Sequence, residues 1–316
     1  MSHLTGSYRF ALTAAFAALL VASLPHGAAA QSKEPVKIGV GVDTAYVPLY
    51  LAKQDKLFDK HGVNVELVQF TQGGDALDAV AAGQMPMGGA AEPTTLIRAA
   101  RTDIKVLGIY GQSASYIKFV AKPGVTEPKQ AKKLGIVPGS VSEFSTELML
   151  TTYAMDPKSV ELIKAGPPEF PALLARGDVD GYFLWEPWPT NGVKQGGKVL
   201  ISSGDVGYTY NMWLAAGGAW LSGHQTEAKS ILAALAEACE IVRADPGKGA
   251  AAVQAEAKIP ATTALEALKE IQCTVRDFND ADMATYDKIA DFLVQHKITP
   301  QKVDLSKVIQ RGFYVK

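Results

Sequence analysis

The segments "GQMPMGGAAEP" (residues 83–93) and "GDVDGYFLWEP" (residues 177–187) follow one plan. Each begins with a glycine after an Ala-rich helical run and reaches Glu-Pro nine residues later. A short run that starts with VEL lies upstream of each, at Val65 and at Val160. Such β-branched and apolar runs are typical of strands, and a glycine after a helical run stops the helix. The repetition predicts that the chain builds two similar units.

Each half of the chain contains a further strand-like run upstream, "VKIGVGV" at Val36 and "KLGIVPGS" at Lys133. Strands that alternate with helical patterns of this length indicate parallel βαβ units with helices on both faces. We therefore expect two α/β lobes joined by two crossing segments, residues 103–125 and 198–221. The predicted division is a first part of lobe 1 at 31–115, lobe 2 at 116–212, and a return to lobe 1 with C-terminal helices at 213–316. Ligands of such sheets bind at the carboxyl ends of the parallel strands, which here face a cleft between the lobes.

Residues 1–30 have the pattern of a secretory signal peptide. Arg9 precedes an apolar run of about fifteen residues, which is shorter than the roughly 20 residues of a membrane span, and "AAAQ" supplies a cleavage site. Cleavage is predicted between Ala30 and Gln31. We expect an exported, periplasmic protein whose mature chain has no membrane span.

The composition excludes several classes of function. Without Arg9 the chain has 30 Lys and Arg against 32 Asp and Glu, and this balance argues against nucleic-acid binding. The five His and two Cys have no metal-ligand spacing, and no catalytic cluster stands out, so no metal, cofactor or catalytic residue is predicted. An oxidising compartment permits a disulfide between Cys239 and Cys273, but the sequence does not decide whether they meet.

Candidate ligand-binding residues lie in the loops expected to face the cleft. Helix starts present free N–H groups that favour anions, strand ends present polar groups, and aromatic side chains provide walls. Lobe 1 offers Asp43, Thr44, Tyr46, Gln72, Gly73, Gly74, Glu92 and Thr94. Lobe 2 offers Ser140, Ser142, Phe144, Trp185 and Glu186. The crossing segments add Ser113, Tyr116 and Asn211, with Tyr210 as a further candidate.

Each candidate also has a structural interpretation. Ser140 and Ser142 could be helix N-caps, Tyr46 and Trp185 could belong to the core, and a Glu before Pro could cap its helix. If the two Glu-Pro strings end equivalent strands, Glu92 and Glu186 project into one cleft from opposite walls. Glu186, in its aromatic frame, is the stronger functional candidate of the two.

The segments "AYVPLYLAKQDKLFDKHGVNVEL" and "GGDALDAVAAGQMPMGGAAEPTTLIRAARTDIKVL" resemble the solute-binding proteins of bacterial ABC importers. The similarity is to the group that binds taurine, alkanesulfonates and nitrate, together with binders of the thiamine pyrimidine precursor. The second-lobe string "ALLARGDVDGYFLWEPW" resembles the same group. This resemblance implies the type II periplasmic-binding-protein fold, a small-molecule ligand, an inner-membrane ABC permease as partner, and a monomer that is not an enzyme.

The ligand and some roles stay open at this level. Glu92 departs from the small or amide residue common at that position of the family, which argues against a small inorganic anion. A sulfonate, an aromatic or a heterocyclic molecule remains possible. Alternative functions are presentation of a ligand to a sensor, or a pyrimidine-synthase-like enzyme on the same fold, against which the signal peptide and the late cysteines argue.

Overall fold

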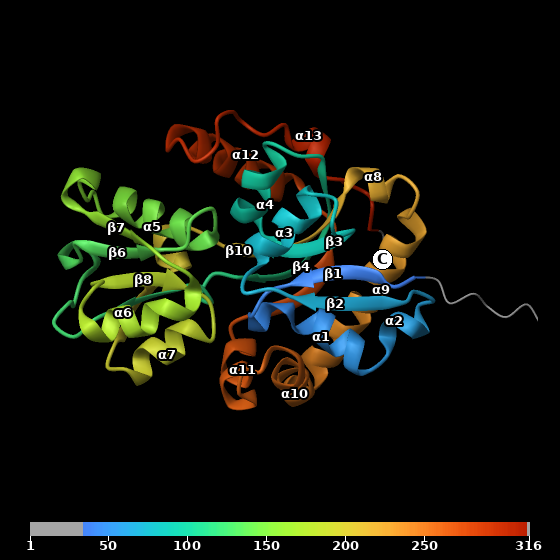
Figure 1. The fold of residues 1–316 in the computed structure, drawn as a ribbon, viewed down its shortest axis with the longest axis horizontal. Coiled ribbons are helices and arrows are strands. Elements are labelled where there is room, and N and C mark those ends of the chain that lie inside the picture. The colour runs from blue at the N-terminus through green and yellow to red at the C-terminus, as the bar shows by residue number, and fades with distance from the viewer. Residues whose placement is uncertain (1–33, 315–316) are drawn as a thin grey trace, which may run out of the picture. The chain divides into compact units, whose positions relative to one another are not determined.

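The computed structural model describes residues 34–314, so the predicted signal peptide and its cleavage site lie outside the described residues. Two sheets organise this part of the chain (Figure 1). The first has six strands in the order β11-β4-β10-β3-β1-β2, and the second has five in the order β7-β6-β8-β5-β9. The predicted α/β architecture with two lobes is confirmed.

The first sheet combines four strands from the first part of the chain, β1 to β4, with two strands from much later in it, β10 and β11. Strand β1 pairs in parallel with both β2 and β3, β10 runs antiparallel between β3 and β4, and β11 forms the edge beside β4. The bounds are β1 Val36–Val40, β2 Val65–Gln69, β3 Met87–Ala91, β4 Ile104–Ser113, β10 Tyr210–Gly217 and β11 Gln272–Arg276.

The second sheet has fewer strands than the first but a corresponding strand order. Strand β6 pairs in parallel with β7 and β8, and β5 runs antiparallel between β8 and β9. The bounds are β5 Lys118–Ala121, β6 Lys133–Ile136, β7 Glu161–Lys164, β8 Gly181–Leu184 and β9 Lys198–Ser202. The order β2-β1-β3-β10 therefore matches β7-β6-β8-β5, as the duplicated strings predict.

A pair of glycines shows that the two halves also pack alike. Gly39 of β1 is opposite Gly88 of β3, and Gly135 of β6 is opposite Tyr182 of β8. A Cβ at Gly39 would lie 2.7 Å from the Ala76 Cβ of the covering helix, and one at Gly135 would overlap the Phe170 ring. In both sheets the strand between the two parallel neighbours lacks a side chain at a point where a covering helix approaches closely.

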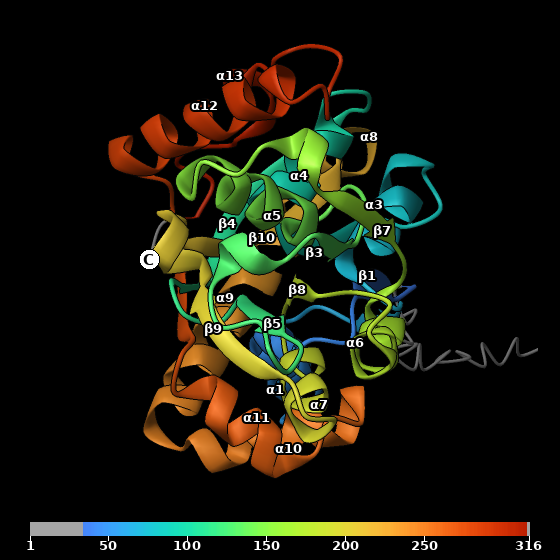
Figure 2. The same cartoon turned by 90° about the vertical axis from the view of Figure 1, so that its left-hand side faces the viewer.

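Helices cover both faces of each sheet (Figures 1 and 2). The first sheet has α3, α4, α12 and α13 on one face and α1, α9, α10 and α11 on the other. The second has α5 on one face and α6 and α7 on the other. Their bounds are α1 Val47–Gln54, α2 Leu57–Lys60, α3 Gly73–Ala81, α4 Glu92–Ala99, α5 Val141–Thr152, α6 Phe170–Arg176, α7 Trp188–Lys194, α8 Gly218–Leu221, α9 Gln225–Ala244, α10 Pro246–Ala257, α11 Ala261–Leu268, α12 Asp280–Gln295 and α13 Leu305–Val308.

Two short connections, residues 114–117 and 203–209, join the lobes and run beside each other. The Ser203 amide donates to the Ile117 carbonyl at 2.8 Å, and the Gly204 amide donates to the Ala114 carbonyl at 2.7 Å. Strand β10 begins at Tyr210, opposite Ser113, so residues 210–212 belong to the first sheet and not to lobe 2, where the sequence had put them. They continue the buried run of β10 without a break, which explains the difference.

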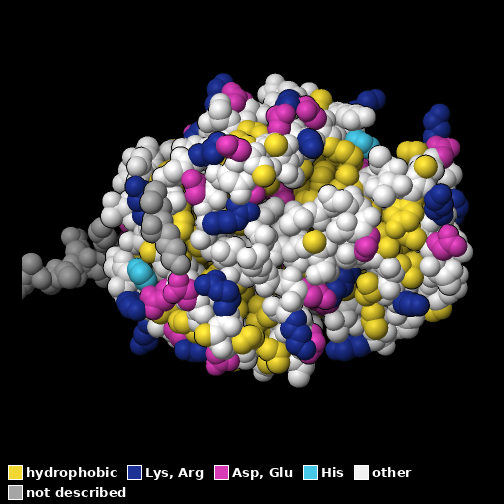
Figure 3. Space-filling view, turned by 180° about the vertical axis from the view of Figure 1, so that it is seen from behind, with side chains coloured by type: hydrophobic (Ala, Val, Ile, Leu, Met, Phe, Trp, Pro, Cys, Tyr) yellow, Lys and Arg dark blue, Asp and Glu magenta, His cyan; other side chains and the backbone are white. Residues whose placement is uncertain are grey.

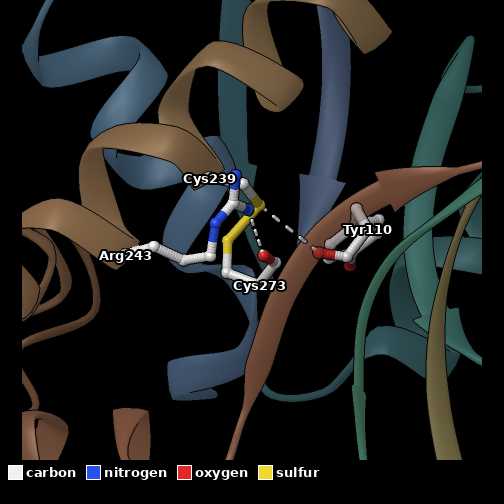
Figure 4. Close-up of a disulfide and its surroundings, with 4 residues drawn as sticks. All are labelled: Tyr110, Cys239, Arg243 and Cys273. Carbon is white, nitrogen blue, oxygen red and sulfur yellow. Dashed lines mark hydrogen bonds between the residues drawn. A yellow bond between two sulfur atoms is a disulfide. The ribbon is translucent and has the colours of Figure 1, made fainter. Parts of the chain in front are cut away.

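A disulfide between Cys239 of α9 and Cys273 of β11 ties the return segment to the first sheet (Figure 4). The Cα atoms are 5.1 Å apart, and Arg243 donates from Nη1 to the Cys273 carbonyl at 2.7 Å. Closing a loop of 34 residues restricts the unfolded chain, which contributes about 3–4 kcal/mol in the chain-entropy model. The sequence did not decide whether the two cysteines meet, and the structure shows that they do, because α9 and β11 lie next to each other.

Two further properties hold for the described residues. Within residues 34–314, no helix combines the length and the apolar character required to cross a membrane. On the face shown in Figure 3, Lys and Arg side chains alternate with Asp and Glu side chains, and no continuous basic area is visible. This distribution agrees with the near-neutral composition.

Candidate functional site

A cavity of about 20 Å³ lies between the strand ends of the first sheet and two loops of the second. It contains eight of the sixteen predicted ligand-binding residues: Asp43, Tyr46, Gln72, Gly73, Gly74, Thr94, Ser140 and Trp185. The remaining lining residues are Ala90, Ala91, Val141, Tyr210 and Met212. A cavity of this volume holds about one water molecule and is well below the range for small-molecule sites, so a larger occupant needs the two walls to be further apart than they are here.

Three helices begin at this cavity. Gly73 and Gly74 open α3, Val141 opens α5 after the N-cap Ser140, and Ala91 is the N-cap of α4. The first-turn amides of a helix have no partner within the helix, and the helix dipole adds a partial positive charge there. An acidic group in the cavity would therefore meet backbone N–H donors from three directions.

The two glycines at the start of α3 are required by close approach. A Cβ at Gly73 would overlap the Tyr46 hydroxyl and come within 2.7 Å of the Gly89 carbonyl oxygen. A Cβ at Gly74 would lie 2.7 Å from Nη2 of Arg98. Because these positions lack side chains, the backbone of α3 itself forms this wall of the cavity.

Asp43 is the acidic residue of the cavity. Its Oδ1 accepts hydrogen bonds from the Ala45 amide at 2.7 Å and from the Tyr116 hydroxyl at 2.5 Å. Burial raises the pKa of Asp43 to about 7, against the lowering effect of these donors, and the charge of Glu186 raises it slightly further. The side chain can therefore change its charge near neutral pH.

Aromatic side chains form the rest of the lining. Tyr46 donates to the Gly89 carbonyl at 2.5 Å, which fixes its ring beneath α3. Trp185, at the end of β8, donates from Nε1 to the Val42 carbonyl at 3.2 Å, so it reaches from the second sheet to the first. Tyr210 extends from β10, and its ring centre lies 5.8 Å from that of Tyr116.

Arg98 of α4 links the lobes beside the cavity, a role that no sequence motif indicates. Its Nε and Nη2 donate to the Asp78 carboxylate at 3.0 Å, and its Nη1 donates to the Gly139 carbonyl at 2.6 Å. Asp78 belongs to α3 of the first lobe, whereas Gly139 belongs to the loop that precedes α5 of the second.

Glu92 does not line the cavity, contrary to the expectation that it projects into the cleft. It is fully buried, and its carboxylate accepts from the Asn211 amide at 2.9 Å and from Asn211 Nδ2 at 3.0 Å. Asn211, also a predicted ligand-binding residue, is thereby occupied with Glu92. Burial raises the pKa of Glu92 to about 7, more than these hydrogen bonds lower it.

Glu186 also lies outside the cavity lining, so the two carboxylates do not face each other across it. Its Oε1 is 3.3 Å from Lys118 Nζ, and its Oε2 accepts from the Thr190 amide at 3.1 Å. Lys118 also pairs with Glu270 at 2.8 Å, which connects the second lobe to the segment before β11. A nearby cation and the first turn of α7 hold this carboxylate outside the cavity lining.

The remaining five candidates lie outside the cavity lining. Tyr116 holds Asp43, and the Ser113 hydroxyl donates to the Glu270 carbonyl at 2.6 Å while it accepts from the Tyr116 amide at 3.0 Å. The Ser142 hydroxyl accepts from the Val137 amide at 3.2 Å, in the loop before α5. Phe144 packs against Tyr208 and Phe292, and Thr44 is buried in the turn after β1.

A family model matches most of the chain. Residues 29–257 match the model of the NMT1-like family. The chain belongs to the NMT1-like family.

Two curated relatives of this NMT1-like chain are named as binding proteins of taurine and of aliphatic sulfonates. The Taurine-binding periplasmic protein of Escherichia coli (strain K12) is 26% identical over 189 residues, which are 57% of this chain and 59% of that protein. The chain thus spans less than two thirds of its length. A Putative aliphatic sulfonates-binding protein of the same organism is 24% identical over 297 residues, covering 89% of this chain and 91% of that one.

Solved structures share the fold. The alkanesulfonate-binding protein SsuA from Xanthomonas axonopodis pv. citri, bound to MOPS, superposes with a TM-score of 0.78 at 17% identity. The comparison covers 88% of this chain and 99% of that chain. At this identity the likeness establishes the fold of the NMT1-like chain and leaves its ligand to be argued from its own residues.

Tyr210, a further candidate from the sequence, belongs to the lining, whereas four other lining residues were not predicted. Met212 lies two residues after Tyr210 on β10, so the two share one face of the strand, and this period of two is the signal that indicates Met212. Ala90, Ala91 and Val141 contribute mainly backbone and small apolar surface, for which no sequence signal exists. Among the described residues, no group of three or more His, Cys, Asp or Glu side chains is placed to hold a metal ion.

Proposed function

We propose that this chain is the solute-binding component of an ABC-type import system. It captures a small organic molecule with an acidic group, of the sulfonate or carboxylate type, in the cavity between its lobes and delivers it to a membrane permease. It works in the periplasm as a monomer without chemical catalysis. The names of two relatives, a Taurine-binding periplasmic protein and a Putative aliphatic sulfonates-binding protein, support a binding role.

The observation that carries the proposal is the convergence of three helix starts on one cavity. The lining residues include no Lys or Arg, so backbone amides of α3, α4 and α5 supply the positive potential. Such donors suit the several oxygens of a sulfonate or carboxylate. An anion held without a fixed cation can also be released again, as delivery to a permease requires.

The cavity is built for closure around its occupant. Residues of both lobes line it, and only two short connections join the lobes. A solute that touches both walls stabilises the closed arrangement over an open one, because it gains contacts only when both walls are present. The same closed form would present a distinct surface to the permease.

A thermal-shift screen tests the proposal. The mature protein is heated with alkanesulfonates, aminoalkanesulfonates, short carboxylates, aromatic carboxylates, pyrimidines and nitrate. A solute at 100 times its Kd adds about 2.7 kcal/mol of apparent stability, and we expect at least one sulfonate or carboxylate to do so. If only pyrimidines or no compound raises the melting temperature, the proposed anion site is contradicted.

A further inference from the structure

The cavity contains one charged side chain, Asp43, on a wall otherwise suited to anions. A carboxylate in an anion site would repel an acidic solute unless it has a different partner. Asp43 is only 6% exposed, so water does not screen it to any large extent. The residue therefore requires an explanation beyond capture of an acidic group.

Only one oxygen of the Asp43 carboxylate, Oδ1, accepts short hydrogen bonds from the surrounding residues. Oδ1 accepts from the Ala45 amide at 2.7 Å and from the Tyr116 hydroxyl at 2.5 Å, and the first of these bonds is the N-cap of the turn after β1. Oδ2 has only a long contact of 3.5 Å from the Tyr210 hydroxyl. Since each carboxylate oxygen can accept two hydrogen bonds, Oδ2 retains capacity for a strong donor.

The neighbours of Asp43 in the cavity favour a cationic donor. Tyr46, Tyr210 and Trp185 line the same cavity, and aromatic faces attract ammonium groups. An ammonium group beside Oδ2 would also form a charge-assisted hydrogen bond in a water-poor setting. The helix starts would then hold the acidic end of the same molecule.

We propose that Asp43 binds an amino group of the solute, so that the preferred solute is a small zwitterion with an amine as well as a sulfonate or carboxylate. The inference rests on the proposed function and narrows its class of solute. Asp43 acts in recognition, and its role in capping the turn through Oδ1 is separate.

Matched solutes test this directly by calorimetric titration at pH 8. In the pairs 2-aminoethanesulfonate with propane-1-sulfonate and β-alanine with butanoate, a methyl group replaces the ammonium group at nearly constant size. On the unmodified mature protein we expect the amino member of at least one pair to bind ten- to a hundredfold more tightly. Asp43→Asn keeps an acceptor for Ala45 and Tyr116, and it should abolish that preference.

A matched control separates recognition from general effects of a buried carboxylate. Glu92 is as buried as Asp43 and has a similarly raised pKa of about 7, but it lies outside the cavity. Glu92→Gln should leave all four affinities unchanged. If Glu92→Gln and Asp43→Asn weaken the amino members equally, recognition by Asp43 is refuted.

The pH dependence provides a second readout. The pKa of Asp43 is raised to about 7 by burial, so the carboxylate is mostly protonated at pH 6. The titratable groups that interact with it are the carboxylate of Glu186 and five phenols, those of Tyr46, Tyr50, Tyr110, Tyr116 and Tyr210. Affinity for the amino member should fall about tenfold from pH 8 to pH 6, and in Asp43→Asn it should stay level.

The outcomes distinguish the two proposals. If propane-1-sulfonate or butanoate binds as well as its amino counterpart, the zwitterion inference fails while the anion site stands. If none of the four compounds binds and the wider screen finds no acidic solute, the proposed function itself fails. If Asp43→Asn melts far below the parent, Tyr116→Phe replaces it, and weakened preference for the amino member supports the role of Asp43.

Discussion

The two Glu-Pro strand ends that reveal the duplication have opposite surroundings. Glu92 begins α4 directly after β3 and is held by the amide and side chain of Asn211, both neutral donors. Glu186 lies shortly after β8, and a cis peptide bond joins it to Pro187. Its carboxylate lies beside Lys118. The repeated string thus ends in the first half in a glutamate with neutral hydrogen-bond partners. In the second half it ends in a glutamate that forms an ion pair.

The difference teaches that the repeated sequence specifies the strand end and not the role of its carboxylate. Each glutamate receives its partner from a crossing segment, Asn211 from β10 in one case and Lys118 from β5 in the other. These two strands hold matching places in the two sheets, but their sequences are not part of the repeated strings. The two halves can therefore share a fold while only the first contributes an acidic residue, Asp43, to the cavity.

Replacement of Lys118 tests the surroundings of Glu186 at the second-lobe strand end, and it should have the largest effect on stability. Lys118→Met leaves the carboxylates of Glu186 and Glu270 close together without their shared partner. Because Glu186 is nearly buried and Glu270 is partly exposed, we expect a loss of about 2–3 kcal/mol in chemical denaturation. Lys37→Met, which breaks an exposed pair with Glu66, is the control and should change stability by about 0.5 kcal/mol or less. Equal losses would contradict the distinction.

Glu92→Gln tests the first-lobe end through pH. Its pKa is raised from 4.5 to about 7 in the folded state, so the native protein binds the proton more tightly than the unfolded chain does. This carboxyl therefore adds stability at low pH, and that contribution is lost as pH rises from about 4.5 to 7.

The expected result is that the free energy of unfolding depends less steeply on pH in Glu92→Gln than in the parent. Between pH 5 and pH 8 the stability of the parent should fall by about 2–3 kcal/mol more than that of Glu92→Gln. Asp43 contributes with the same sign to both proteins, so it cancels in the difference. Parallel stability curves over this range, measured by urea denaturation, would show that Glu92 does not titrate near neutral pH.

The contact between lobes at Arg98 should have a smaller effect. Arg98→Met removes the 2.6 Å hydrogen bond to the Gly139 carbonyl, together with a pair to the exposed Asp78, for a loss of about 1 kcal/mol. Small-angle scattering should show a larger radius of gyration for the unliganded variant, because fewer bonds join the lobes. Arg176→Met breaks an exposed pair within the second lobe and should leave the radius unchanged. A similar increase in both variants would argue against a linking role.

Trp185→Phe should produce the smallest change. It removes the donor to the Val42 carbonyl, which joins the lobes by one neutral hydrogen bond, and we expect a loss of about 0.5–1 kcal/mol. Trp188→Phe is the comparison, since the Trp188 indole N–H has no hydrogen-bond partner among the described residues. A larger loss in Trp188→Phe, measured by urea denaturation, would mean that ring packing outweighs the bond at these sites.

The fold was predictable to a large extent because its signals are local. The VEL runs, the glycine stops and the spacing of the Glu-Pro strings fixed the parallel units, and β1 to β3 and β6 to β8 have that arrangement. The end of the second lobe was misplaced by three residues, because a buried strand such as β10 has no polar alternation that marks its start.

The site was predictable by half, and the division has a physical cause. Residues at the starts of α3 and α5 reach the cavity because helix starts at the carboxyl ends of parallel strands point there by geometry. Glu92, Glu186, Asn211 and Tyr116 do not, because each is turned by a partner distant in the sequence.

The sequence by itself determined two α/β units, their connection and the loops from which a cavity could be built, since periodicity and turn residues act over a few neighbouring positions. Tertiary structure decided the pairing of Cys239 with Cys273, the partners of the two glutamates, and the choice of Asp43 as the acidic residue of the cavity. Charge, burial and hydrogen bonding of a side chain depend on what packs against it, and in this fold the decisive neighbours come from strands far along the chain.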